Sequence, residues 1–441
     1  MKQKIGLVSL GCSKNLVDSE KMLGILKEAG YIFTSDESDA DIIIVNTCGF
    51  IESAKKESID TILEMAEYKK GKCKKLIVTG CLAQRYKDLL FDEMPEIDVI
   101  LGTNSYEKIL EALKSKDTKP LFCETSDLMT PSPRVLTSND GHSYLKIAEG
   151  CDNHCTYCVI PKIRGGYNSR KMEDLVDEAR FLAKSGVKEL VIIAQDSTVY
   201  GKDLYGSKKL TQLIKELSKI DEIEWLRLLY CYPEGIDQEL IEEFASNPKL
   251  CKYIDIPMQH ASDNVLRRMG RKGNQQQLRE LISNLKTLVP GMVIRTTFMV
   301  GFPGETKEDF EELCKFVEEM EFDRLGAFMY SKEEDTPAFK MRPQIVKKTK
   351  RERYDKIMSL QNNIVREKNT SRVGNVYKTL VQGILEDGTY FGRTYAEAPE
   401  ADGLVYFRSK TPLLKSSFQS VKIVDYKDYD LMGVVENESA K

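Results

Sequence analysis

The sequence lacks any apolar run long enough to cross a membrane. None of its hydrophobic stretches approaches the roughly 18 residues that a membrane helix needs. The first residues, MKQKIGLVSLGC, hold two lysines and a short apolar run that a cysteine follows at once, so they predict a first strand and not a signal peptide. We therefore expect no membrane contact and a cytoplasmic location.

The sequence also lacks an excess of positive charge. Its 65 Lys and Arg residues face 69 Asp and Glu residues, which gives a formal net charge of −4. Nothing in this balance requires a nucleic-acid partner, although a local basic patch can hide inside an acidic total, so RNA contact stays possible. A hydrophobic fraction of 41% and a charged fraction of 30% indicate an ordinary soluble globular protein.

Cysteine, in contrast, is present in number. A cytoplasmic compartment keeps thiols reduced, so the eleven cysteines are not expected to form a disulfide framework. Some are candidates for metal ligands, and the others are small buried hydrophobes. We interpret five of them as structural: Cys73, Cys123, Cys231, Cys251 and Cys314.

Three segments differ in pattern. In the first, residues 1–125, the apolar runs KIGLVSLG, DIIIVNT, KLIVTG and DVILGT alternate with amphipathic stretches. This alternation predicts a parallel sheet with helices on its faces. A polar passage with two prolines, ETSDLMTPSPRVLTSNDGHS (residues 124–143), then predicts a linker.

The second segment, residues 140–335, predicts six strand–helix units. Its strand candidates are YLKIAEG, ELVIIAQ, WLRLLYCY, YIDIPMQ, VIRTTFMVG and RLGAFMYS. Six units are too few for a closed eight-fold barrel of about 250 residues, so an open six-unit (β/α) barrel is expected. Thr306 and Asp309 have the spacing of a helix-capping box.

The last segment changes character. Residues 345–371 predict a charged linker helix, and residues 372–438 alternate β-branched and aromatic residues with turn residues. An Asp-Gly hairpin signal lies in EDGTYFG. These features predict a small antiparallel β-barrel of four or five strands.

Three cysteines each follow an apolar run of the first segment. Cys12 follows KIGLVSLG, Cys48 follows DIIIVNT and Cys81 follows KLIVTG. The carboxyl ends of parallel strands lie on one edge of a sheet, where ligands bind, so these thiols are expected to converge. The alternative is that they are three ordinary thiols at strand ends.

Three more cysteines lie within eight residues. Cys151, Cys155 and Cys158 form a CxxxCxxC group, which can place three thiolates around an iron–sulfur cube and leave one iron open. The alternatives are a zinc site that recruits His154 or a distant cysteine, and three purely structural cysteines.

This CxxxCxxC group, placed after the first strand of a six-unit barrel, resembles the radical S-adenosylmethionine (radical SAM) enzymes. The resemblance implies that the open iron binds S-adenosylmethionine and that the reduced cluster cleaves it to a 5′-deoxyadenosyl radical. VGFPGET (residues 300–306) is similar to the segment that lies against the adenosine, and AQDSTVYG (residues 194–201) to the strand end near the methionine moiety. The residues that the resemblance suggests for cofactor binding are Tyr157, Gln195, Asp196 and Gly301.

The three upstream cysteines narrow the resemblance to the radical SAM methylthiotransferases, whose small C-terminal barrel is a TRAM domain. This resemblance implies that Cys12, Cys48 and Cys81 hold a second [4Fe–4S] cluster, and that flavodoxin or ferredoxin donates electrons. GCSKNLVDSE, IDIPMQHASDNVLRRMGRKG and GRTYAEAPEADGLVYF resemble the RimO branch, which methylthiolates the β-carbon of an aspartate in ribosomal protein S12. The other branch, of MiaB and MtaB type, modifies a tRNA adenosine.

The charge of the last segment bears on this choice. Residues 372–441 contain nine Lys and Arg against ten Asp and Glu, a net of −1. A barrel that grips tRNA phosphates is expected to be basic, whereas a neutral-to-acidic barrel suits a basic ribosomal protein. The hypotheses are therefore a ribosomal-protein methylthiotransferase, a tRNA methylthiotransferase, and a non-catalytic iron–sulfur protein that binds RNA.

Overall fold

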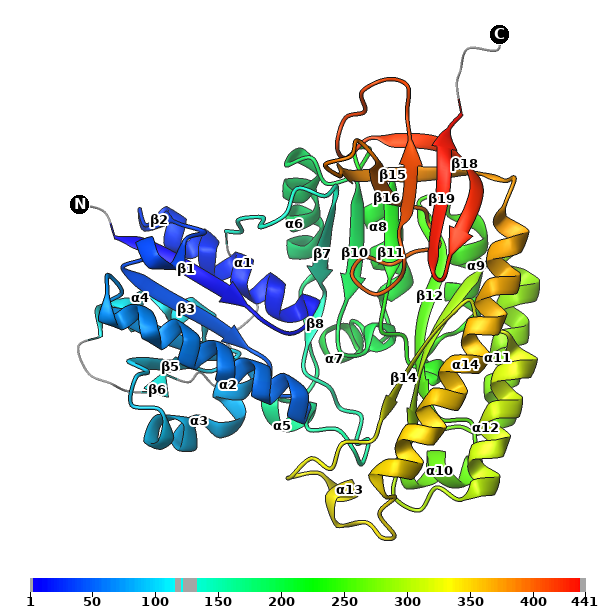
Figure 1. Ribbon diagram of the computed structural model, residues 1–441, viewed down its shortest axis with the longest axis horizontal. Coiled ribbons are helices and arrows are strands. Elements are labelled where there is room, and N and C mark those ends of the chain that lie inside the picture. The colour runs from blue at the N-terminus through cyan, green and yellow to red at the C-terminus, as the bar shows by residue number, and fades with distance from the viewer. Residues whose placement is uncertain (1–2, 116–119, 122–132, 437–441) are drawn as a thin grey trace. The chain divides into compact units, whose positions relative to one another are not determined.

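A computed structural model describes residues 3–115, 120–121 and 133–436, and the chain divides into two compact units (Figure 1). Unit 1 comprises Met1–Thr137, Ala148–Asp174 and Glu333–Thr336, and unit 2 comprises Ser138–Ile147, Leu175–Lys332 and Pro337–Lys441. Within the described ranges, no helix is both long and apolar enough to span a membrane.

A six-stranded parallel sheet forms the centre of unit 1. Its spatial order is β2-β1-β3-β4-β5-β6, so the order reverses between β1 and β3. The strands are β1 (Lys4–Ser9), β2 (Ile32–Phe33), β3 (Ile42–Thr47), β4 (Lys75–Gly80), β5 (Val99–Leu101) and β6 (Pro120–Leu121). The four apolar runs therefore form β1, β3, β4 and β5, which confirms the predicted parallel-sheet domain.

Helices cover both faces of this sheet, as Figure 1 shows. The helices are α1 (Ser13–Glu28), α2 (Glu52–Glu67), α3 (Cys81–Glu93) and α4 (Ile109–Lys114), with 3₁₀ turns η1 (Glu37–Asp39), η2 (Tyr68–Lys70) and η3 (Tyr106–Lys108). On one face Val45 and Val78 pack with Ile62 of α2 and Leu82 of α3. On the other, Ile44 and Ile77 pack with α1 and α4. Because side chains alternate between two buried faces, each of the longer strands contains a continuous apolar run.

The remaining part of unit 1 carries the CxxxCxxC group. It contains β8 (Ala148–Glu149), α5 (Ile160–Arg164) and β9 (Asn168–Ser169), and β8 pairs antiparallel with β9. The described end of the predicted linker is attached to α1, since Arg134 Nε donates to Glu20 Oε2 at 2.8 Å and Thr137 N donates to Glu20 Oε1 at 2.9 Å.

The predicted linker, residues 124–143, is partly wrong. Residues 124–132 lie outside the described residues, and residues 133–141 contain neither helix nor strand. His142 and Ser143 begin a strand instead, because they pair in parallel with Glu189 and Leu190. The pairing satisfies their backbone groups inside a buried sheet.

Unit 2 contains a second six-stranded parallel sheet, in the order β14-β13-β12-β11-β10-β7. Its strands are β7 (His142–Lys146), β10 (Glu189–Ile193), β11 (Trp225–Leu228), β12 (Leu250–Gln259), β13 (Val293–Val300) and β14 (Arg324–Met329). The order follows the sequence, with β7 and β14 at the edges, so the predicted open six-unit barrel is confirmed.

Helices surround this second sheet. They are α6 (Met172–Lys184), α7 (Lys202–Tyr205), α8 (Leu210–Ser218), α9 (Gln238–Ser246), α10 (Asp263–Arg268), α11 (Gln275–Leu288), α12 (Lys307–Met320), α13 (Pro337–Lys340) and α14 (Lys347–Arg372), with η5 (Ser197–Val199) and η6 (Pro233–Gly235). The predicted capping box is present at α12, where Thr306 Oγ1 accepts from Asp309 N at 3.1 Å and Asp309 Oδ2 accepts from Thr306 N at 2.9 Å. The predicted charged helix is α14, and it packs against β14 and α12.

The C-terminal strands form a closed five-stranded barrel in the order β15-β16-β17-β19-β18. They are β15 (Val376–Ile384), β16 (Tyr390–Arg393), β17 (Val405–Arg408), β18 (Phe418–Lys427) and β19 (Asp430–Val435). The small barrel is confirmed, but one of its five pairings, β17 with β19, is parallel. β19 reverses direction after β18 and so runs in the same direction as β17. This parallel pairing follows from the strand order of the closed barrel, which local hairpin signals do not indicate.

Buried charges attach this barrel to the sheet of unit 2. Arg227 Nε and Arg393 Nη2 donate to the two carboxylate oxygens of Glu189, each at 2.6 Å. Burial opposes ionisation of Glu189, but Arg393 and Arg227 outweigh it and lower the pKa of that carboxyl to about 2. The ion pair joins β10, β11 and β16.

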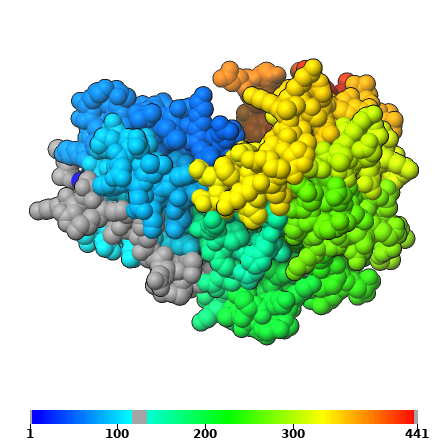
Figure 2. Space-filling model, turned by 90° about the horizontal axis from the view of Figure 1, so that it is seen from below, coloured from blue at the N-terminus to red at the C-terminus, as the bar shows by residue number. Residues whose placement is uncertain are grey.

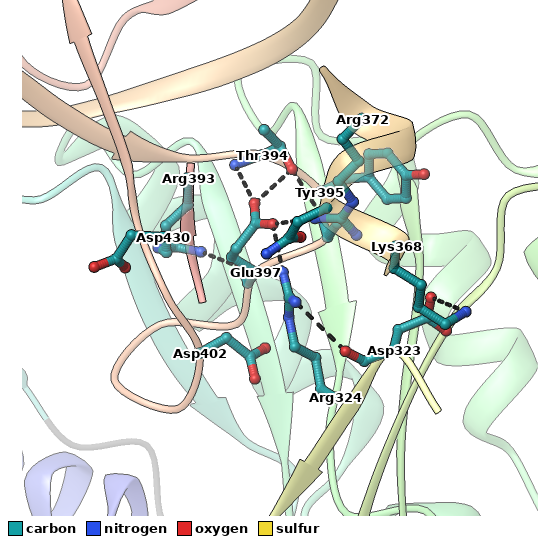
Figure 3. Close-up of polar contacts among 12 residues, drawn as sticks. Asp323, Arg324, Lys368, Arg372, Arg393, Thr394, Tyr395, Glu397, Asp402 and Asp430 are labelled. Carbon is teal, nitrogen blue, oxygen red and sulfur yellow. Dashed lines mark hydrogen bonds and ion pairs between the residues drawn. The ribbon is translucent and has the colours of Figure 1, made fainter. Parts of the chain in front are cut away.

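A second buried carboxylate lies in the segment between β16 and β17 (Figure 3). Glu397 Oε1 accepts from Arg324 Nη2 at 2.8 Å and from Arg372 Nη1 at 2.9 Å. In the same segment, Asp402 Oδ2 accepts from the Tyr253 hydroxyl at 2.6 Å. These contacts join the segment to β12, β14 and the end of α14, so unit 2 is held together by paired and hydrogen-bonded charges.

Candidate metal centre

The three strand-end cysteines of unit 1 lie at one edge of its sheet. Cys12 follows β1 and is the residue before α1, Cys48 follows β3, and Cys81 is the first residue of α3. The reversal of strand order lies between β1 and β3, which is where open α/β sheets bind ligands. Cys48 and Cys81 each interact electrostatically with Cys12, so the structure brings the three predicted thiols together.

Glycine allows the three loops to approach one another closely. A Cβ atom on Gly11 would lie 2.9 Å from Cys48 Cβ and 3.3 Å from Cys48 Sγ, and Gly11 has a φ of +91°. A Cβ atom on Gly80, with a φ of +94°, would lie 2.4 Å from the carbonyl oxygen of Thr47. Only glycine fits at these positions, because any other residue would push the cysteine-bearing loops apart.

Asn15 fixes the geometry of this edge. Its Nδ2 donates to the carbonyl oxygens of Leu10 at 2.9 Å and Thr47 at 3.0 Å, so it joins the ends of β1 and β3. Its Oδ1 accepts from Cys81 Sγ at 3.7 Å. Asn46 Nδ2 donates in turn to the Asn15 carbonyl oxygen at 2.8 Å. Asn15 is 1% exposed, so these hydrogen bonds hold the edge in one arrangement.

Arg164 brings a buried positive charge to the same edge. Its Nη2 donates to Asn15 Oδ1 at 2.6 Å and to Cys81 Sγ at 3.6 Å. Its Nη1 donates to both oxygens of Glu149 at 2.9 Å and lies 3.3 Å from Asp18 Oδ2. Arg164 is 1% exposed and belongs to α5, which follows the CxxxCxxC group. The helix that follows the CxxxCxxC group therefore places its guanidinium against Cys81 of the other set of cysteines.

The three thiols differ in their acidity. Dense surroundings oppose ionisation of Cys12, although the residue keeps an exposed surface, but Lys14 and Arg164 outweigh this and lower its pKa. Burial raises the pKa of Cys48, and it raises the pKa of Cys81 to about 12 against the effect of Arg164. A cation that binds at this edge would reverse these effects, because a coordinating thiol is deprotonated.

The CxxxCxxC group forms a compact loop in unit 1. Cys151 and Cys155 are buried and Cys158 is half-buried. The backbone N–H of Asn153 donates to Cys151 Sγ and that of Ile160 donates to Cys158 Sγ, both at 3.4 Å. Backbone N–H groups that donate to sulfur favour the thiolate form, which is the form that binds iron.

The donor set at these two places fits iron–sulfur clusters. Each place offers three cysteines and N–H or guanidinium groups directed at sulfur, and Val159 and Ile163 pack against Cys81. Among the described residues, no group of three or more His, Cys, Asp or Glu side chains is gathered tightly enough for one ion. His154 is exposed. Each set offers three thiols, one short of the four ligands of a structural zinc site.

The other predicted binding residues lie in several places. Tyr157 is half-buried in the cysteine loop of unit 1. Gln195 and Asp196 follow β10 in unit 2, and Asp196 Oδ1 accepts from Thr198 N at 3.1 Å and Thr198 Oγ1 at 2.6 Å, which caps η5. Gly301 follows β13 with a φ of +72°. The structure thus places Gln195, Asp196 and Gly301 at the carboxyl edge of the second sheet.

Several contributors were not predicted. Asn15, Glu149 and Arg164 are buried polar residues at the thiol edge, yet nothing in their local sequence marks them. The one available signal was position, because Arg164 lies six residues after Cys158. Of the cysteines interpreted as structural, Cys73, Cys231 and Cys251 are buried and Cys314 is half-buried, while Cys123 lies outside the described residues.

Family models match three parts of the chain. Residues 4–102 match the uncharacterized protein family UPF0004, residues 145–317 match the radical SAM superfamily, and residues 373–435 match the TRAM domain. These ranges correspond to the sheet domain of unit 1, the open barrel with its cysteine loop, and the small closed barrel.

Curated relatives match over the whole length. The chain is 55% identical over 453 aligned residues to the ribosomal protein uS12 methylthiotransferase RimO of Acetivibrio thermocellus, with 100% of each chain covered. It is 53% identical over 444 residues to the protein of the same name from Clostridium tetani, again with 100% of each covered.

Solved structures resemble the fold at low identity. The radical S-adenosylmethionine methyltransferase TsrM from Kitasatospora setae aligns with a TM-score of 0.56 and 14% identity, over 74% of this chain and 73% of that chain. The cobalamin-dependent S-adenosylmethionine radical enzyme OxsB aligns with a TM-score of 0.54 and 14% identity, over 83% of this chain and 56% of that chain. At this identity the likeness concerns the fold alone.

Proposed function

The chain belongs to the ribosomal protein uS12 methylthiotransferase RimO family, and from this premise we propose that it places a methylthio group on the β-carbon of an aspartate in uS12. Membership in the radical SAM superfamily implies S-adenosylmethionine and one [4Fe–4S] cluster. A second [4Fe–4S] cluster is part of the proposal. The reaction would take place in the cytoplasm with flavodoxin or ferredoxin as the electron donor.

The bound cofactors would supply the reactive groups of this reaction. When bound, one cluster with S-adenosylmethionine would supply a radical able to take hydrogen from an unactivated C–H bond. The other would bind the sulfur that is transferred, and a second S-adenosylmethionine would supply its methyl group. The protein has to bind, orient and shield these groups.

Cys151, Cys155 and Cys158 are proposed to hold the cluster that binds S-adenosylmethionine. The N–H groups of Asn153 and Ile160 donate to two of these sulfurs and so support their thiolate form. Tyr157, Gln195, Asp196 and Gly301 are proposed to contribute to cofactor binding.

Cys12, Cys48 and Cys81 are proposed to hold the second cluster. Asn15 joins the loops that carry them, and Arg164 places a guanidinium against Cys81. A positive charge next to a sulfur-rich anion lowers its cost of burial. The exposed surface of Cys12, beside buried Cys81, leaves this site accessible on one side.

The observation that carries the proposal is the meeting of Cys12, Cys48 and Cys81 at the point where the strand order of unit 1 reverses. A radical SAM enzyme that only cleaves its cofactor has no need of a second cysteine set. A thiol set at a ligand-binding sheet edge is what a sulfur-inserting enzyme needs.

The proposal is tested by anaerobic reconstitution followed by reaction with purified unmodified uS12. We expect two clusters, about eight irons per chain, cleavage of S-adenosylmethionine, and uS12 heavier by one methylthio group in place of one hydrogen. The C12A/C48A/C81A variant should still cleave S-adenosylmethionine but leave uS12 unmodified. Modification of uS12 by this variant would contradict the role given to these three cysteines.

A further inference from the structure

A short basic segment interrupts this otherwise acidic chain. Residues 337–351, PAFKMRPQIVKKTKR, contain six Lys and Arg residues and no Asp or Glu. The rest of the chain therefore carries a formal net charge of −10, because the whole chain has −4. We refer to residues 337–351 as the basic strap. It comprises α13, the first turn of α14 and the connection between them, and it lies within the yellow surface of Figure 2.

Five of the six charges of the strap are exposed, and Arg351 among them pairs with Asp355 at 3.1 Å. Lys340, Arg342, Lys347 and Lys348 are all exposed. Among the described residues, Lys340 and Lys347 have no carboxylate within ion-pair distance, and Lys348 reaches Glu352 only at 3.9 Å. The side chain of Arg342 donates to a carbonyl oxygen, that of Met341, at 3.0 Å. Most of this positive charge is thus unneutralised by the chain.

Another lysine-rich stretch of the chain behaves differently. KKGKCKK, residues 69–75, holds five lysines in unit 1. Lys69 pairs with Asp98 at 2.8 Å, Lys70 pairs with Glu67, Lys72 pairs with Asp39 at 2.6 Å, and Lys75 donates to the Leu113 carbonyl oxygen at 2.8 Å. These lysines serve the fold, whereas those of the strap have few partners within the fold.

The strap is attached to the loop that follows β13. Gly304 N donates to the Pro343 carbonyl oxygen at 2.8 Å, and Arg268 Nη2 donates to the Arg342 carbonyl oxygen at 3.1 Å. The stem of Lys350 packs over Gly301, where an added Cβ would lie 2.3 Å from Lys350 Cγ. Gly301 and Gly304 both belong to VGFPGET, at the carboxyl edge of the second sheet. The strap is therefore fixed beside the edge to which the proposed cofactor residues belong.

We propose that the basic strap binds the phosphate backbone of RNA and that the enzyme modifies uS12 within an RNA-containing ribosomal particle. The second half of this statement rests on the proposed function. A row of exposed Lys and Arg, most of which lack a neutralising carboxylate, is the usual electrostatic footprint for phosphates. RNA bound to the strap would hold the ribosomal particle, with its uS12, beside the carboxyl edge of the second sheet.

RNA fits the strap better than an acidic peptide does. Protein–protein interfaces are depleted in lysine at their centres and depend on buried apolar or aromatic anchors. The strap presents five exposed charges, of which Arg351 pairs with Asp355, and Val346 is its one large exposed apolar side chain among the described residues. The small C-terminal barrel, with its net charge of −1, does not offer a comparable surface for phosphates.

The test compares two variants with equal loss of charge. One is K340A/R342A/K347A/K348A in the strap. The matched control is K184A/K219A/K272A/K315A, which removes four exposed lysines elsewhere in unit 2. Binding of the reconstituted full-length proteins to a labelled single-stranded RNA is measured over a range of salt concentrations. Methylthiolation is measured in parallel on free uS12 and on small ribosomal subunits from cells that lack the enzyme.

We expect the strap variant to lose roughly 10- to 100-fold in RNA affinity near 0.15 M salt. The slope of log affinity against log salt concentration should become less steep by up to about 3. The control variant should change little in either quantity. The strap variant should modify free uS12 normally and subunits poorly. Equal RNA binding by both variants, binding of an acidic peptide in place of RNA, or unchanged modification of subunits would overturn the proposal. If wild type modifies neither substrate, the proposed function fails, and the RNA measurement still decides whether the strap binds phosphate.

Discussion

The Nη2 atom of Arg164 lies 3.6 Å from the Sγ atom of Cys81 in the interior of unit 1. Arg164 is the last residue of α5, the helix after the CxxxCxxC group, whereas Cys81 is the first residue of α3 and directly follows β4. The contact joins two parts of the chain that are 83 residues apart, and each part carries one of the proposed cluster sites. Through this contact, the helix that follows one set of cysteines is held against a member of the other set.

Replacing Arg164 by methionine should destabilise unit 1 strongly. The substitution would leave Glu149 and Asp18 as buried carboxylates without their shared cation. Removing one partner of a buried ion pair costs about 3–5 kcal/mol. Urea unfolding of the metal-free protein under reducing conditions measures the effect. The control is R180A, which removes an exposed arginine paired with Asp177 and should change stability by less than about 1 kcal/mol. Equal stability of R164M and wild type would contradict the contact.

Substitution of the cysteines should separate the two clusters. C12A/C48A/C81A and C151A/C155A/C158A should each bind about four irons after reconstitution, against about eight for wild type. The matched control, C73A/C231A/C251A, removes three buried cysteines that we interpret as structural and should keep all the iron. Iron and sulfide analysis provides the measurement. A zinc site would instead show up as zinc bound without sulfide.

Glu397→Gln should weaken the attachment of the small barrel to the second sheet. Burial opposes the charge of Glu397, but Arg372 and Arg324 outweigh it and lower its pKa. The variant removes the charge that both arginines share, at a cost of about 3 kcal/mol. Hydrogen exchange in β15–β19 should then increase relative to wild type. D425N, an exposed carboxylate on β18, serves as the control, and an effect of similar size there would argue against a specific role for Glu397.

Stability should fall as the pH falls below about 6.5, because two histidines are buried. Burial lowers the pKa of His142 to about 4, with help from the positive charge of Arg393, and it lowers that of His260 to about 3. A group with a lowered pKa in the folded state stabilises the fold fully above its unfolded value and loses this contribution as the pH falls towards the folded value. For His142 the loss by pH 4 is about 3 kcal/mol.

The measurement is urea unfolding of the metal-free protein between pH 7.5 and about 4. H142Q should flatten the pH dependence. H154Q, at an exposed position, should leave it as in wild type. If H142Q and wild type lost stability in parallel, the buried neutral state of His142 would be wrong.

The sequence predicted the architecture where the signal was local. Each apolar run of four to six residues became a strand, and a cysteine directly after it had to lie at the carboxyl edge, because parallel strands share a direction. Thr306 and Asp309 formed the capping box because its hydrogen bonds depend only on neighbouring residues. The motifs GCSKNLVDSE and GRTYAEAPEADGLVYF also indicated the RimO branch, which the full-length relatives confirm.

Contacts between residues that are far apart in the sequence were not predicted. The parallel pairing of β17 with β19 arises from closure of the barrel, which no hairpin signal describes. Arg164 resembles any basic residue near a helix end until the fold places it against Asn15 and Cys81. GRTYAEAPEADGLVYF resembles a family motif. Its Arg393, Glu397 and Asp402 also make the ion pairs and hydrogen bonds that attach the barrel to the sheet.

The central claim is that this chain methylthiolates uS12. Its most direct test is to delete the gene, restore it with wild type or with C12A/C48A/C81A, and examine uS12 and tRNA nucleosides by mass spectrometry. We predict that deletion removes the methylthio group from uS12 alone, that wild type restores it, and that the cysteine variant does not. If uS12 kept its methylthio group while a tRNA nucleoside lost its own, the account would be contradicted.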